Sequence, residues 1–400
     1  MNIALINFDV IVNCFGGVSK VFAEMSNSFV ERGHTVTALT YEFRQGQPAF
    51  YLVPFDSKYN YFLYFDPRVM LKNCCNSSFE RLFHNDGIAK FRTFYIRDRE
   101  TRRIKRYQIE LNNKSKAIEK ALKEVKPDVI VAFQQEIAYL LMDILKVKVP
   151  VVTMLHNEPS FYFERPEFKI FKPALNKCAY VQVLVPQYVE QAQHYLGTDN
   201  VICIPNIVPQ YKDSAELKNP VILNVAKIAS RKRQHLILEA FAKIEQKFPD
   251  WTVNIWGWDK TEYAEKLKNE IKNLGLESKV KLCGETKQVT EKYNSASIFA
   301  FPSAYEGFSL ALTEAMSAGL PVIGCNDCLS VSSLIQHGVN GLLSDCTADD
   351  FAQQLARLMS DYELRAQLGH EAKESMKNFS PENVWKQWET LLCSVSQKKS

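Results

Sequence analysis

The chain has 400 residues, of which 46% are hydrophobic and 24% are charged, and its formal net charge is +4 at pH 7. This composition is ordinary for a soluble globular protein, and the small net charge argues against a nucleic-acid partner. No apolar run reaches the roughly eighteen residues that a membrane-spanning helix requires, so we expect none. The length predicts two domains rather than one.

The first residues and the cysteines bear on the compartment. The opening run MNIALINFDVIV is apolar and no basic residue precedes it, so we expect a buried strand rather than a signal peptide. Ten cysteines without an export signal indicate a reducing compartment, and we predict a cytoplasmic protein. Cys325 and Cys328 have C-x-x-C spacing, but no second pair or histidine cluster stands nearby, so we expect neither a metal nor a redox role for them.

The first half of the chain alternates short apolar runs with helical patterns. A predicted strand at 3–8 is followed by Gly16 and Gly17, an amphipathic helix over 18–32 and a second strand at 35–41. Similar apolar runs follow at residues 127–133, 150–155 and 179–186. Continuous apolar strands separated by helices indicate a parallel sheet that is covered on both faces.

One region departs from this pattern because it is strongly basic. Residues 86–126 contain thirteen Lys/Arg against six Asp/Glu, and apolar and polar residues alternate over 91–111. We predict a basic, exposed β-hairpin at about residues 88–110. It is either a solvated insertion or a surface that attracts an anionic lipid or a phosphate-bearing acceptor.

A second series of elements begins after a proline-containing linker at 204–220. Its predicted strands lie at 221–226, 251–256, 279–284, 297–302 and 320–324. The fold class is therefore α/β, with two Rossmann-like domains whose parallel sheets face each other across a cleft. We predict an N-terminal domain at 1–208, a C-terminal domain at 209–380 and a last helix at 381–400 that packs back on the N-terminal domain.

Two carboxylates stand eight residues apart in the segment FPSAYEGFSLALTEAMSAGLPVIG. A helix should begin near Ser309, with Glu306 before it and Glu314 more than one turn inside it. The carboxylates would then be about 10 Å apart, which is the span from ribose to sugar in a nucleotide-diphosphate sugar. The amides at the helix start between them form an anion site. The spacing fits such a ligand.

A basic loop follows the first strand of the second domain. It offers Lys227, Arg231, Lys232 and Arg233, which suit the charge of a leaving diphosphate. No Asp-x-Asp motif occurs, so lysines in place of a metal are consistent with the sequence. A solvated charge run at a helix start remains the alternative.

The first domain offers two candidates. Gly16 and Gly17 follow the first strand, where they allow close approach to a phosphate or form only a tight turn. His156 ends the strand at 150–155 at its carboxyl edge, where ligand-facing residues belong. A structural histidine remains the alternative.

Together these segments resemble a known family. EGFSLALTEAMSAGLPVIG is similar to the E-x(7)-E signature of family-four retaining glycosyltransferases with the GT-B architecture, and NVAKIASRKRQHLILEAF is similar to that family's strand–basic-loop–helix segment. The glycine pair, the strand-end histidine, IPN before the linker and the last, tryptophan-bearing helix follow in the expected order. The resemblance is strongest over 221–343 and weaker over 1–206.

The resemblance implies a role for each matching residue. Glu314 would bind the ribose hydroxyls, Lys227 and Lys232 would neutralise the diphosphate, and the segment around Gly284 and Glu285 would line the nucleobase pocket. The phosphates would also contact backbone near Gly16, Gly17, Ser309 and Leu310. Glu306 and the backbone of Gly307 and Phe308 would position the donor sugar, beside His156.

The resemblance also implies a mechanism. The acceptor oxygen attacks on the face that the diphosphate leaves, and this needs positioning and charge stabilisation rather than a protein nucleophile. Three positions depart from the family pattern. Ala226 and Lys227 replace Gly-Arg, Ser309 replaces a frequent glycine, and Ile207 stands where glycine is common.

We therefore predict a metal-independent retaining glycosyltransferase, hexosyl- or N-acetylhexosaminyl-, with no cofactor. Its donor would be a nucleotide-diphosphate sugar, which we expect to be a UDP-sugar, and its acceptor a glycan or lipid-linked glycan of surface polysaccharide biosynthesis. Residues Arg97–Arg106 would contact an anionic membrane peripherally. The alternatives are a nucleotide-sugar epimerase or hydrolase and a catalytically silent partner subunit. A dehydrogenase is disfavoured because no G-x-G-x-x-G follows the first strand.

Overall fold

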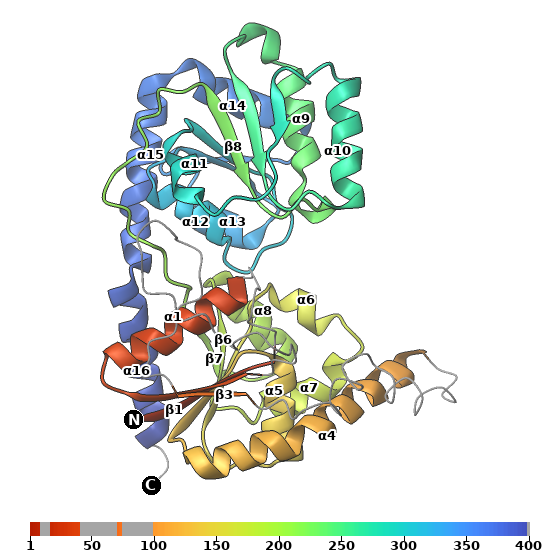
Figure 1. The fold of residues 1–400 in the computed structure, drawn as a ribbon, viewed down its shortest axis with the longest axis vertical. Coiled ribbons are helices and arrows are strands. Elements are labelled where there is room, and N and C mark those ends of the chain that lie inside the picture. The colour runs from red at the N-terminus through yellow and green to blue at the C-terminus, as the bar shows by residue number, and fades with distance from the viewer. Residues whose placement is uncertain (9–16, 41–69, 74–98, 398–400) are drawn as a thin grey trace. The chain divides into compact units, whose positions relative to one another are not determined.

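The computed structural model describes residues 1–8, 17–40, 70–73 and 99–397 (Figure 1). The chain divides into two compact units, and each is described by itself. Unit 1 comprises Met1–Pro205 together with Val384–Ser400, and unit 2 comprises Asn206–Asn383. Among the described helices, none combines the length and the apolarity that crossing a bilayer requires.

Unit 1 is built on a seven-stranded parallel sheet in the order β3-β2-β1-β4-β5-β6-β7. The strands are β1 Asn2–Asn7, β2 Thr35–Thr40, β3 Met70–Asn73, β4 Val129–Ala132, β5 Val151–Met154, β6 Tyr180–Val183 and β7 Val201–Cys203. The residues of β1, β2, β4, β5 and β6 are mostly buried, as expected for a parallel sheet with both faces covered. The strand order reverses between β1 and β4, so the carboxyl ends of these two strands flank the topological switch point.

The helices of unit 1 follow the strands along the chain. They are α1 Gly17–Glu31, α4 Arg99–Val125, α5 Gln135–Tyr139, α6 Pro159–Phe163, α7 Phe168–Leu175, α8 Gln187–Leu196 and the larger part of α16 Pro381–Gln397, and a π-helical turn spans Leu140–Ile144. Just after α1, Gly33 adopts φ 83°, a left-handed conformation that suits glycine at the end of a helix.

The last helix, α16, is part of unit 1 although it is the last element of the chain. Trp385 and Trp388 are buried, and the Trp385 ring lies 5.9 Å from the Phe29 ring of α1. Glu389 accepts hydrogen bonds from Arg32 at 3.0 Å and from the His34 ring at 3.1 Å. These contacts attach the end of the chain to α1 and the start of β2.

The prediction of a β-hairpin at 88–110 is wrong for residues 99–110, which are helical. Residues from Arg99 onward form the 27-residue helix α4, while 88–98 and therefore Arg97 lie outside the described residues. The buried side chains of α4 include Leu111, Ile118 and Ala121, a helical rather than a two-residue period. The alternation at 91–111 was too short to distinguish the two structures.

Unit 2 contains a six-stranded parallel sheet in the order β10-β9-β8-β11-β12-β13. Its strands are β8 Val221–Val225, β9 Thr252–Trp256, β10 Val280–Leu282, β11 Ile298–Phe301, β12 Val322–Cys325 and β13 Leu342–Ser344. Numbered within the unit, this is the Rossmann order 3-2-1-4-5-6, and its switch point lies between β8 and β11.

The helices of unit 2 cover both faces of this sheet (Figure 1). They are α9 Gln234–Ala242, α10 Glu262–Asn273, α11 Val289–Asn294, α12 Leu310–Ser317, α13 Leu329–Leu334, α14 Ala348–Ser360 and α15 Tyr362–Met376, with 3-10 turns at Ser230–Lys232, Glu245–Lys247 and Lys377–Phe379. Each unit therefore has the Rossmann-like α/β architecture that the sequence predicts.

Candidate active site

The switch point of unit 2 brings together the two segments that the sequence singles out. The loop after β8 carries Lys227 and Lys232, and the loop after β11 carries Glu306 and Ser309. Because β8 and β11 are adjacent and parallel, both loops leave the same edge of the sheet. Ligands of open α/β sheets bind at this position, outside the carboxyl ends of the strands.

Lys232 and Glu306 form an ion pair between these two loops. The Lys232 ammonium donates to Glu306 Oε1, and the two side chains are only 11% and 12% exposed. The ammonium also lies 5.8 Å from the centre of the Phe301 ring at the end of β11. The Ala304 amide donates to the Arg231 carbonyl at 2.9 Å, which joins the loops through their backbones as well. Both charged groups are therefore held in defined positions.

Ser309 is the residue before the first turn of α12, and its backbone is left-handed, with φ 53° and ψ 56°. Glycine would adopt this conformation without steric cost, whereas serine adopts it with strain. The Ser309 hydroxyl compensates in part through a 3.0 Å hydrogen bond with Ser330. Leu310 begins the helix, and the first amides of any helix have no partner within it. Gly307 and Phe308 are buried just before it.

Glu314 lies in the second turn of α12, where it is 7% exposed. The hydroxyl of Tyr293, in α11, donates to Glu314 Oε2 at 3.1 Å and lies 3.3 Å from the Ala311 carbonyl. Tyr293 itself is fully buried. This tyrosine fixes one oxygen of the carboxylate, and the sequence gives no signal for it beyond an aromatic residue shortly before β11.

Lys227 is exposed, and its ammonium lies 5.5 Å from the centre of the Trp258 ring, which follows β9. The neighbouring Gly257 permits this close packing, because a Cβ atom there would lie 1.9 Å from the Ala226 carbonyl oxygen. The Gly257 amide donates to the Gly284 carbonyl at 2.8 Å, and Glu285 is exposed beside it. The segment after β9 therefore contacts both Lys227, after β8, and Gly284, after β10.

Arg233 does not join the group of cations that we expected for the diphosphate. Its guanidinium donates a 2.9 Å hydrogen bond to Asp327 Oδ1 after β12 and lies 2.7 Å from Oδ2 in an ion pair. The hydrogen bond to Asp327 raises the pKa of Arg233 further above its usual range. The sequence shows no signal for this pair, because the two residues are far apart along the chain.

His156 lies in unit 1, just after β5. Its ring stacks on Phe133 with centres 5.3 Å apart, its backbone amide donates to the Tyr162 hydroxyl at 3.1 Å, and its Nε2 atom is buried without a hydrogen-bond partner among the described residues. Burial lowers the pKa of His156 to about 4, although a hydrogen bond with the Phe133 backbone opposes the shift. The imidazole is therefore neutral at pH 7.

The switch point of unit 1 is held by amide side chains. The Gln134 amide donates to Asn7 Oδ1 at 2.5 Å and its oxygen accepts from the Phe8 backbone at 3.1 Å, so Gln134 joins the ends of β1 and β4. Gly17 is exposed as the first residue of α1, whereas Gly16 lies outside the described residues. His156 and Gly17 belong to unit 1, and the other described candidates belong to unit 2.

Comparison with known proteins gives sequence relatives. Among them is an uncharacterized glycosyltransferase of Haemophilus influenzae, 30% identical over 55% of this chain and 62% of its own length. The amylovoran biosynthesis glycosyltransferase AmsD of Erwinia amylovora is 26% identical over 48% of this chain and 56% of its own length. The chain spans less than two thirds of the length of these relatives.

A likeness of fold extends over nearly the whole chain. HepE of Anabaena, in a crystal structure with UDP and glucose, superimposes with a TM-score of 0.71 and 17% identity, covering 98% of this chain and all of that one. The family description "Glycosyltransferase Family 4" matches residues 15–210, and "Glycosyl transferases group 1" matches residues 209–375. The chain therefore belongs to the family-four glycosyltransferases and has the GT-B fold.

Proposed function

We propose that the protein is a retaining glycosyltransferase that moves a hexosyl or N-acetylhexosaminyl group from a UDP-sugar to a hydroxyl of a glycan. The observation that carries the proposal is the Lys232–Glu306 ion pair at the switch point of unit 2. It holds a cation for a diphosphate and a carboxylate for sugar hydroxyls next to the start of α12. HepE, which shares this fold, was crystallised with UDP and glucose.

The nucleotide would extend from the start of α12 toward β10. The diphosphate would contact Lys227, Lys232 and the amides of Ser309 and Leu310, while Glu314 would accept hydrogen bonds from the ribose hydroxyls. Tyr293 supports this assignment because its hydroxyl fixes one oxygen of the Glu314 carboxylate and so orients the group. The nucleobase would border Gly284 and Glu285, and Gly17 of unit 1 would contact a phosphate.

The sugar would contact Glu306 and the backbone of Gly307 and Phe308. In the transfer, the bond between the anomeric carbon and the diphosphate oxygen breaks and a bond to the acceptor oxygen forms on the same face. The acceptor proton passes to a diphosphate oxygen. Lys232 stabilises the charge that accumulates on the leaving group, and it requires no metal for that task. The neutral His156 contributes a hydrogen bond or its dipole rather than a charge.

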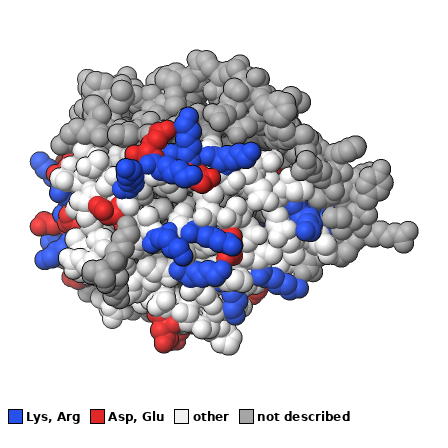
Figure 2. Space-filling model, turned by 90° about the horizontal axis from the view of Figure 1, so that it is seen from below, with Lys and Arg blue, Asp and Glu red and all other residues white. Residues whose placement is uncertain are grey.

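The acceptor would be a lipid-linked or free glycan of surface polysaccharide biosynthesis. Helix α4 supports an anionic acceptor, because it contains nine Lys/Arg and four Asp/Glu. Lys114 lies 4.6 Å from the Phe8 ring beyond the end of β1, so the preceding turns of α4 extend past the carboxyl edge of the sheet. In Figure 2 clusters of Lys and Arg with interspersed Asp and Glu mark the face of the molecule that is seen from below.

A donor screen tests the proposal. The purified chain is incubated with UDP-, GDP-, ADP- and TDP-sugars and candidate acceptors, with and without EDTA, and released nucleoside diphosphate is measured. We expect release from a UDP-sugar, unchanged by EDTA, and a product with the donor's anomeric configuration in NMR spectra. Release or epimerisation without any acceptor would favour the hydrolase or epimerase, and no calorimetric donor binding would favour a silent subunit.

Peripheral membrane contact at a cytoplasmic surface is proposed separately. Replacing Arg102, Lys105 and Arg106 with Gln should weaken binding to vesicles that contain anionic lipid, most strongly at low salt. The matched control replaces Lys243, Lys266 and Lys268 of unit 2 with Gln and should leave binding unchanged. Equal vesicle binding by both variants at low salt would contradict the contact through α4.

A further inference from the structure

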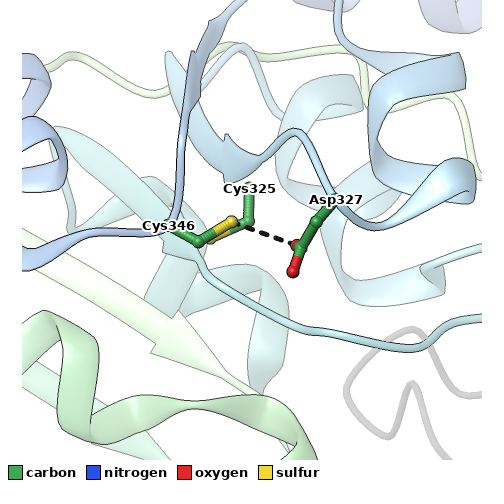
Figure 3. A group of neighbouring side chains, drawn as sticks. All are labelled: Cys325, Asp327 and Cys346. Atoms are coloured by element: carbon green, nitrogen blue, oxygen red, sulfur yellow. Dashed lines mark hydrogen bonds between the residues drawn. The ribbon is translucent and has the colours of Figure 1, made fainter.

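Two cysteines and an aspartate converge at the carboxyl ends of β12 and β13. Cys325 is the last residue of β12 and lies opposite Ser344 of β13, so Cys346, two residues further on, is at the same edge of the sheet. Asp327 follows Cys325 by two residues. One ligand atom from each of the three side chains lies within 4.8 Å of the others, and Figure 3 shows the three pointing toward one another.

The cluster is buried on the side of Cys325 and exposed to solvent on the side of Asp327. The Cys346 thiol donates to Asp327 Oδ1 at 3.0 Å, and its sulfur lies 4.0 Å from Asn326 Oδ1. Cys325 is fully buried, Cys346 is half-buried and the Asp327 side chain is 44% exposed. A small solute can therefore approach past Asp327 and meet the sulfurs behind it.

The charge around the cluster stays balanced when a cation replaces protons. With both thiols protonated, the Asp327 carboxylate and the Arg233 guanidinium neutralise each other in an ion pair, through a 2.9 Å hydrogen bond and a 2.7 Å contact. If one divalent cation replaces the two thiol protons, two thiolates and one carboxylate face the cation and Arg233, and the sum is again zero. Binding thus leaves no uncompensated charge in a partly buried site.

We propose that Cys325, Cys346 and Asp327 bind one thiophilic divalent cation of the zinc class. Each thiol releases its proton to solvent, its sulfur lone pair binds the cation, and no electron is transferred. Asp327 Oδ1, now the acceptor from the Cys346 thiol and from Arg233, becomes the oxygen ligand, while the 2.7 Å contact of Arg233 with Oδ2 orients the carboxylate. Two sulfurs and one oxygen suit Zn²⁺ and not Mg²⁺. Asn326 or water would supply the fourth ligand.

The structure separates this site from the C-x-x-C spacing in the sequence. Cys328 precedes α13 and lies 3.8 Å from the Ser330 hydroxyl, outside the group of three ligands. The cysteine that joins Cys325 is instead 21 residues further along the chain, brought there by the pairing of β12 with β13. The proposal does not depend on glycosyl transfer, because no ligand belongs to the donor-binding residues.

Cadmium titration tests the site. The full chain is reduced, stripped of metal and titrated with Cd²⁺, and thiolate-to-cadmium charge transfer is followed in the ultraviolet, with Zn²⁺ as competitor. We expect one Cd²⁺ that Zn²⁺ displaces. Cys346→Ser, at a half-buried position, should weaken this binding more than about 100-fold, above the 10–100-fold effect of outer ligands. Asp327→Asn should weaken it less.

Cys328→Ser is the matched control and should leave the titration unchanged. Zinc should also protect two thiols from a thiol reagent in the wild type and in Cys328→Ser, but not in Cys346→Ser. The proposal is overturned if Cys346→Ser binds Cd²⁺ as the wild type does, or if Cys328→Ser abolishes binding. It is also overturned if Zn²⁺ does not protect the two thiols of the reduced wild type, and they are lost only by forming a disulfide with each other. Folding of each variant is verified by circular dichroism.

Discussion

The switch points of the two units are built on the same topology but carry different chemistry. In unit 2 the strand ends present an ion pair, Lys232 with Glu306, and a buried carboxylate, Glu314. In unit 1 they present amides, Asn7 and Gln134, and a histidine that burial keeps neutral. The same order of strands thus supports a charged edge in one unit and a hydrogen-bonding edge in the other, so the position of a site follows from topology and its chemistry from a few side chains.

Removing the charges at the strand ends of unit 2 gives the strongest test of the difference between the two units. We expect Lys232→Ala and Glu306→Ala each to reduce turnover by about 10²–10³, because each removes a preorganised charge from the reacting centre. Steady-state kinetics with the donor found in the screen measures this. Lys243→Ala, which removes a lysine paired with Asp349 on the surface, is the control and should retain turnover. Near-normal turnover in a folded Lys232→Ala variant would remove that residue from the site.

The neutral edge of unit 1 predicts a dependence of stability on pH. The pKa of His156 is about 4 in the folded chain and about 6.5 when unfolded, so the unfolded chain binds the additional proton between these values. The contribution of the neutral His156 to the free energy of unfolding is fully present above pH 6.5. It falls by about 2–3 kcal/mol as the pH drops to 4. Hydrogen exchange of the β1, β4 and β5 amides at several pH values measures this loss.

His156→Gln is the comparison variant for that experiment, because glutamine does not titrate. Its free energy of unfolding should change less between pH 6.5 and 4 than that of the wild type. An identical change in both proteins would mean that His156 carries no such proton, and the contrast between the two edges would then lose its electrostatic basis.

The smallest expected effect distinguishes the two carboxylates of unit 2. Tyr293→Phe removes the hydrogen bond to Glu314 and should cost about 1 kcal/mol of donor binding, roughly a fivefold increase in the donor KM, with kcat nearly unchanged. The reason is that Glu314 is assigned to the ribose, away from the bond that breaks. A fall in kcat at constant KM would instead place Glu314 at the reacting centre.

Much of the fold could be predicted from the sequence. Apolar runs marked β1, β2, β4, β5 and β6 in unit 1 and β8 to β12 in unit 2, because strands buried on both faces are apolar throughout. The edge strands β3, β7 and β13 were missed, although strands as short as β10 were predicted. Helix α4 was mistaken for a hairpin because a local alternation preceded its helical period.

The candidate site also has features that the sequence predicts and features that it does not. The meeting of the strand-end residues Lys232 and Glu306 could be predicted, because topology places them at one edge, while their role with a diphosphate sugar stays a prediction. Tyr293, Asp327 and the pairing of Cys325 with Cys346 could not, since each depends on which side chains meet after folding. The left-handed conformation of Ser309 was also hidden, because serine does not signal it as glycine would.

The place of α16 has a consequence for the order of folding during synthesis. Unit 2 is formed by one continuous segment, Asn206–Asn383, whereas unit 1 needs Trp385 and Trp388 from the end of the chain. When residues 1–205 have left the ribosome, most of unit 1 has been made, but the surface of α1 around Phe29 that Trp385 covers is still exposed. The N-terminal unit, although made first, is therefore completed last, and unit 2 can reach its native state before it.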